Sequence, residues 1–191
     1  MKSKVAYAFL GKSFLSLSLF MASWAASAQT AYEYPNTTQI VREVFSVVSR
    51  VNYLEDPKDI SMGPVGYPCI ESILFAPEMI NAMFKKSPVE QIQSDEALFG
   101  SPKAQEAFAL FKRQTAPMFK ERNAKKANRV GKDAFEKFGM SVGEKPFVHM
   151  MQYMQNVQSV INQPEMQTHF EKSLSQPVCA PFVEYLQKNS K

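Results

Sequence analysis

TQIVREVFSVVSRVNYLE, residues 38–55, is the stretch that decides the fold. Its apolar side chains recur at three- and four-residue steps: Ile40, Val44, Val47, Val48, Val51 and Leu54. Val41 and Phe45 widen this apolar face. The frequent β-branched residues would also suit a strand, but the length and the period favour a helix. A face this broad predicts a helix that packs on more than one neighbour.

The distribution of proline and glycine over the rest of the chain favours a series of helices separated by short breaks, with 12 prolines and only 7 glycines in 191 residues. Proline and glycine mark the boundaries of helices. A loop is predicted over 57–68, followed by a helix that breaks or bends near Pro77 and then runs to Lys86, and by a short helix over 89–99. A long helix from 101 to Gly139, which Pro117 bends or interrupts, comes next, and then a helix over 146–162 and short helices from Pro164 and from Pro177 or Pro181. The predicted fold class is all-α, an irregular bundle of about six to eight helices broken by prolines.

The first 28 residues have the features of a cleaved export signal. A lysine-containing start precedes an apolar run from Phe14 to Ala25 that is too short to cross a bilayer, and Ala26-Ser27-Ala28 supplies the small residues that a signal peptidase needs. Cleavage after Ala28 would leave residues 29–191, a length that suits a single helical domain. The predicted location is the periplasm.

The two cysteines, Cys69 and Cys179, both lie after the predicted cleavage site. An even pair in an oxidising compartment predicts one disulfide. Two free thiols serving redox or metal chemistry would be the alternative, but the pair lacks the Cys-x-x-Cys spacing of such sites.

Charge argues against a nucleic-acid partner for the exported form. The whole chain has 22 basic and 18 acidic residues, but three of the lysines and none of the acids lie in residues 1–28. The exported form is therefore close to neutral, and the basic isoelectric point of the whole chain says little about partners.

A local cluster of positive charge is predicted on a helix from Lys120 to Gly139. Small and aromatic residues would share one face of this helix, and five basic residues would form the opposite face: Arg122, Lys125, Lys126, Arg129 and Lys132. The pairs Arg122–Lys126 and Lys125–Arg129 place like charges four residues apart, which is slightly destabilising. This basic face predicts either a solvated surface or a docking surface for an acidic protein partner or an anionic envelope surface.

Residues 149–154, HMMQYM, resemble the soft-ligand runs that bind copper, but the helical projection separates His149 from the methionines. The methionines are predicted to fill the core, and His149 to be an ordinary surface residue. The chain has no Cys-x-x-Cys-His and no His-Glu-x-x-His motif, so no metal or other cofactor is expected.

Catalytic motifs such as Gly-x-Ser-x-Gly or a glycine-rich phosphate loop are also absent from the sequence. The acidic pairs Glu55-Asp56 and Asp95-Glu96 lie near predicted helix ends, where acids are common. A catalytic function would require a concave site that gathers acids, or His149 with a neighbour such as Tyr153.

The sequence thus favours a non-catalytic exported binding protein, either an accessory or structural component of a cell-envelope assembly or secretion system, or a small helical chaperone. A carrier of an apolar small molecule or lipid is the alternative, because 15 phenylalanines and 11 methionines could line an apolar pocket as well as a core. An enzyme is the third and least favoured class.

Overall fold

The computed structural model describes residues 31–57 and 63–189. The predicted signal, residues 1–28, lies outside them. Within the described ranges all regular structure is helical, in the order α1 Pro35–Glu55, α2 Tyr67–Leu74, α3 Pro77–Phe84, α4 Val89–Phe99, α5 Pro102–Thr115, η2 Ala116–Lys120, α6 Ala124–Val142, α7 Glu144–Gln155, α8 Val157–Ile161, α9 Pro164–Leu174, η3 Pro177–Cys179 and α10 Ala180–Asn189. The predicted all-α bundle broken by prolines is confirmed.

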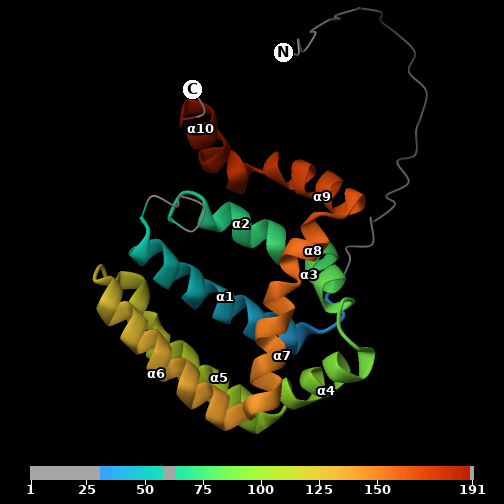
Figure 1. The fold of residues 1–191 in the computed structure, drawn as a ribbon, viewed down its shortest axis with the longest axis vertical. Helices are drawn as coiled ribbons and strands as arrows, with labels where there is room; N and C mark the ends of the chain where they lie inside the picture. Colours follow the sequence, from blue (N-terminus) through green and yellow to red (C-terminus); the bar gives the residue numbers. More distant parts are fainter. Residues whose placement is uncertain (1–30, 58–62, 190–191) are drawn as a thin grey trace, which may run out of the picture.

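Helix α1 lies in the middle of the bundle, between the α5–α6 pair and α2 (Figure 1). Its predicted apolar face is confirmed, since Ile40, Val44 and Val47 are fully buried and Val48 and Val51 are half-buried. Full burial of one such side chain contributes about 1.5–3 kcal/mol. Contacts with α4, α5, α6 and α7 explain why so broad an apolar face is needed.

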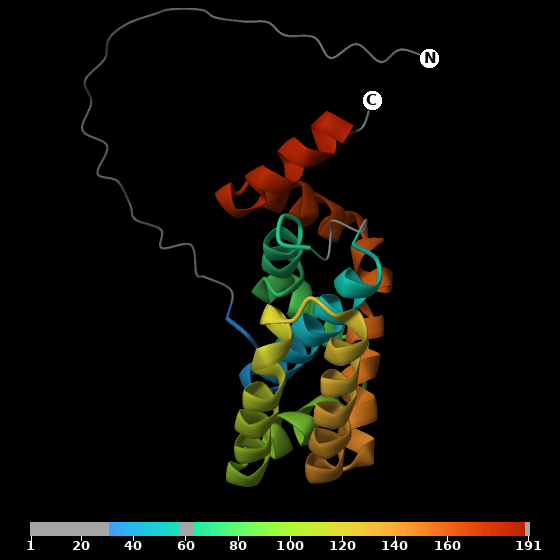
Figure 2. The same cartoon turned by 90° about the vertical axis from the view of Figure 1, so that its left-hand side faces the viewer.

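Helices α5 and α6 lie side by side and are joined by the short 3-10 helix η2 (Figure 2). The predicted single long helix is therefore interrupted, as expected, at Pro117, but α6 begins at Ala124 instead of Lys120. The reason is local, because the Asn123 side chain accepts a hydrogen bond from the Lys126 N–H at 3.1 Å and caps the new helix. From α1, the Arg50 guanidinium donates to the carbonyl oxygens of Met118 and Glu121 and holds the connection in place.

The predicted end of this helix at Gly139 is wrong. Gly139 lies inside α6, which continues to Val142 and ends at Gly143. Gly143 has a φ of 98°, a conformation that favours glycine. An added Cβ at Gly139 would meet the Phe147 ring at 3.4 Å, so this glycine serves the close approach of α7 and does not end the helix.

The C-terminal helices are attached to the bundle through the predicted disulfide. Cys69, in the first turn of α2, is bonded to Cys179 in η3, and both residues are fully buried. Helix α10, which follows η3, lies at the end of the molecule (Figures 1 and 2). The predicted helix over 146–162 is divided into α7 and α8 at Asn156, whose side-chain amide donates to the Met83 carbonyl oxygen of α3 at 3.1 Å.

Candidate functional site

The predicted basic face is exposed in all five of its residues. Four of them lie on α6, but Arg122 lies in the non-helical segment before it, so Arg122 and Lys126 are not helical neighbours. Lys126 forms an ion pair with Glu121 at 2.7 Å. In the described part of the chain, no carboxylate lies within ion-pair distance of Arg122, Lys125, Arg129 or Lys132.

Glu121 organises the start of this basic face. Its carboxylate binds Lys126 and also accepts hydrogen bonds from the backbone N–H groups of Asn123 and Arg122, both at 3.0 Å. These contacts, with Lys126 first, lower the pKa of the Glu121 carboxyl to about 2. Glu121 thus stays ionised at any physiological pH and neutralises one of the five positive charges.

An apolar groove runs beside the basic face, between α1, α6 and α7. We call it the α6 groove; it has a volume of about 320 Å³ and is lined by Val48, Val51, Asn52, Asn128, Gly131, Lys132, Phe135, Phe147 and Met151. A more open hollow of about 680 Å³, the outer hollow, shares three of these residues, Lys132, Phe135 and Phe147, and therefore adjoins it. The α6 groove falls within the usual size range of small-molecule sites, about 300–1,000 Å³.

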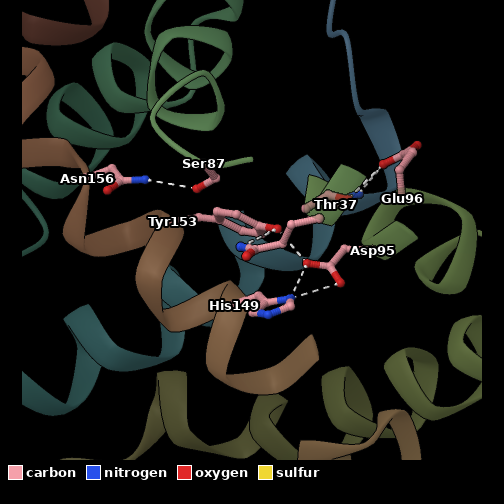
Figure 3. A network of polar contacts seen from close by, with 8 residues as sticks. Thr37, Ser87, Asp95, Glu96, His149, Tyr153 and Asn156 are labelled. Atoms are coloured by element: carbon pink, nitrogen blue, oxygen red, sulfur yellow. Dashed lines mark hydrogen bonds and ion pairs between the residues drawn. The ribbon is translucent and has the colours of Figure 1, made fainter. Parts of the chain in front are cut away.

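A buried polar network lies on the side of α7 that faces α4. His149 and Tyr153 are four residues apart and so share one face of α7, and both contact the Asp95 carboxylate of α4 (Figure 3). His149 Nδ1 lies 3.0 Å from Asp95 Oδ2 and 3.2 Å from Oδ1, and the Tyr153 hydroxyl donates to Oδ2 at 2.5 Å. The Asp95 side chain is 3% exposed and that of His149 is 12% exposed.

The donors in this network are set by the carboxylate, because an ionised aspartate accepts hydrogen bonds and donates none. His149 therefore carries its proton on Nδ1, and Gln91 in turn donates to the Tyr153 oxygen at 3.3 Å. Burial, and then the hydrogen bond to Asp95, raise the pKa of the Tyr153 phenol above its usual value. The network joins α4 to α7 through buried, directional contacts.

The neighbouring residue, Glu96, joins α4 to α1. Its carboxylate accepts hydrogen bonds from the backbone N–H and the side chain of both Asn36 and Thr37, at 2.7–3.0 Å. Figure 3 shows the contact with Thr37. These N–H groups are at the start of α1, where no carbonyl of the helix can accept from them. The acidic pair Asp95-Glu96 thus has an interhelical role, and the explanation by local helix-end electrostatics is wrong.

The prediction of His149 as an ordinary surface residue is also wrong. Beside the network lies a polar cleft of about 430 Å³, lined by Pro88, Glu90, Gln91, Ser94, Asp95, Lys145, Pro146 and His149. His149 and Asp95 line this cleft, whereas Tyr153 contacts Asp95 from the fully buried side and does not line it. One sequence signal could have revealed that Asp95 is buried. Asp95 follows Ile92 by three residues and precedes Phe99 by four, so all three lie on the same, buried face of α4.

The methionines of α7 behave as predicted, since Met150 is fully buried in the core and Met151 and Met154 pack against it. Across the described ranges, no group of three or more His, Cys, Asp or Glu side chains is arranged to hold a metal ion. Among the same residues, no helix has the length and apolar character needed to cross a membrane.

No protein-family model matches this chain, and neither the curated proteins nor the solved structures contain a significant match to it.

The raised pKa of Tyr153 predicts a stability loss at alkaline pH. The folded state keeps the Tyr153 phenol neutral, whereas the same phenol ionises near pH 10 in the unfolded chain. The contribution of Tyr153 to the free energy of unfolding is therefore complete below pH 10 and falls as the pH rises above it. We expect a loss of about 1.4 kcal/mol per pH unit in this window. Urea unfolding at pH 9 and pH 11 should show a smaller loss for Tyr153→Phe than for the wild type, and equal losses would contradict the assignment.

Proposed function

We propose that this protein is an exported, non-catalytic binding protein of the periplasm, an accessory or structural component of a cell-envelope assembly or a small helical chaperone. The lysine-containing start, short apolar run and small residues of positions 1–28 support export. The Cys69–Cys179 disulfide is consistent with an oxidising compartment.

The observation that carries the binding function is the exposed basic face. Lys125 and Arg129 are one helical turn apart on α6, and both are exposed without an ion-pair partner in the described part of the chain. Like charges at this spacing repel by a few tenths of a kcal/mol in the isolated protein. An acidic partner surface would relieve the repulsion and would also speed association.

The polar network supports a structural role for His149 and Asp95. Both oxygens of the Asp95 carboxylate and the Nδ1 atom of His149 are engaged within the network, and the pair is almost fully buried. These contacts position α4 and α7 relative to each other, which any helical bundle requires. We therefore assign the network to the framework and not to substrate chemistry.

Charge reversal tests the proposed docking surface. We expect Arg122→Glu, Lys125→Glu and Arg129→Glu combined to abolish capture of the partner after crosslinking in the source cells, because binding would now oppose like charges. The matched control reverses three exposed lysines outside the face, Lys86, Lys103 and Lys172. It has the same net charge and should capture the partner normally; equal capture by both variants would refute the proposal.

A further inference from the structure

The α6 groove combines an apolar wall with a single cation. Val48 and Val51 of α1 face Phe135 of α6 and the α7 residues Phe147 and Met151 across it. These side chains come from three helices that are packed together in the core, so the groove is a formed feature of the bundle. Apolar walls of this kind take up the hydrocarbon part of a ligand.

Lys132 is the one charged residue among the described residues that line the groove, and its side chain is exposed. It also lines the outer hollow, so it stands where the narrow apolar section meets the more open one. Asn52 and Asn128 also line the groove, and the Asn128 side-chain amide donates to the Glu55 carboxylate at 2.8 Å. The acids Glu136 and Glu144 line the outer hollow and are absent from the lining of the groove.

The geometry points to a binding site for a single-chain anionic amphiphile, such as a fatty acid, whose hydrocarbon chain lies in the α6 groove and whose anionic head group contacts Lys132. A volume of about 320 Å³ is at the lower end for ligand sites and suits one chain better than two. Charge complementarity with Lys132 selects an anionic head over a cationic one.

The outer hollow gives such a ligand a path to solvent. Met140, one of its lining residues, is 72% exposed, which is unusual for a large apolar side chain. Its flexible thioether can adapt to a bound chain. Lys132 belongs to the basic face as well as to this site, but the docking test reverses only Arg122, Lys125 and Arg129, so separate variants test the two proposals.

Three probes of equal chain length test the head-group preference: dodecanoate, dodecanol and dodecyltrimethylammonium. Each probe is used below its critical micelle concentration. Its binding affinity is measured by displacement of a bound dansyl-labelled undecanoate. We expect dodecanoate to bind the wild-type protein at least tenfold more tightly than the cationic probe. Lys132→Glu should weaken dodecanoate about tenfold, whereas Lys137→Glu, on α6 but outside the groove lining, should not.

A second variant tests the position of the chain. Val51→Phe fills the groove from α1 and should weaken all three probes at least tenfold, while Val148→Phe, an exposed residue of α7 outside the lining, should leave them unchanged. Circular dichroism checks the fold, and Met151→Phe replaces Val51→Phe if the latter fails to fold. The proposal would be overturned if dodecanoate did not bind, or if the anionic and cationic probes bound equally well. Unchanged binding of the probes to Val51→Phe would also overturn it.

Discussion

Replacing Cys69 and Cys179 together by alanine is expected to lower the free energy of unfolding by about 4–5 kcal/mol. The two residues are 110 positions apart, and in the chain-entropy model a loop of about this length contributes close to 4.7 kcal/mol by restricting the unfolded chain. This is a large share of the 5–15 kcal/mol that stabilises an ordinary domain.

The effect should be strongest at the C-terminal end, because the disulfide attaches η3 to α2 directly. Urea unfolding followed by circular dichroism measures the loss, and hydrogen exchange locates it. We expect α9 and α10 to lose protection before α1 and α6 do. A loss below about 1 kcal/mol, or uniform protection in all helices, would show that packing alone holds the C-terminal helices.

Asp95→Asn is expected to cost about 3 kcal/mol, the second largest effect. The buried carboxylate accepts from both His149 and Tyr153, and an amide of the same shape offers one acceptor oxygen and brings an NH₂ group against two donors. Hydrogen bonds to a charged group typically contribute about 1.5–3 kcal/mol each, and Asp95→Asn disturbs two of them. Asp133→Asn, an exposed aspartate of α6, is the control and should change stability by less than about 0.5 kcal/mol.

A double-mutant cycle separates the network from the loss of one charge. Asp95→Asn combined with Tyr153→Phe should cost less than the sum of the two single variants, by about 0.5–3 kcal/mol, because the residues are in direct contact. If the losses in the free energy of unfolding of the two single variants were additive, the Tyr153 hydroxyl and Asp95 would act independently. The network would then not explain how α4 and α7 are positioned relative to each other.

Helix positions followed from the sequence wherever proline or glycine and apolar periodicity agreed. Helix α4, Val89–Phe99, has the predicted bounds, and α9 begins at Pro164 as predicted. Ser101 caps α5 by accepting a hydrogen bond from the Ala104 N–H. Errors arose where a side chain from a distant helix or a capping residue decided the boundary. Asn123 caps α6, which therefore begins four residues after the predicted start at Lys120. At Asn156 the predicted single helix is divided into α7 and α8, and the Asn156 side-chain amide donates to the carbonyl oxygen of Met83 in α3.

The site could be predicted only in part. The exposure of Lys125, Arg129 and Lys132 followed from the helical projection of α6, since a single helix determines which residues oppose its apolar face. The Asp95–His149 contact joins residues 54 positions apart, and the α6 groove is formed by α1, α6 and α7 together. Both depend on how helices cross, which periodicity within one helix does not describe.

The most direct test of the central claim, that the basic face of α6 docks an acidic partner, is photo-crosslinking from single positions. Benzoylphenylalanine at positions 125 and 129 should form an adduct with one and the same protein, attached to an acidic segment, in cells that express the full chain. The same group at Lys103 of α5, outside the basic face, should form no such adduct. Adducts formed equally well from position 103, or attached to segments without acidic residues, would contradict the claim.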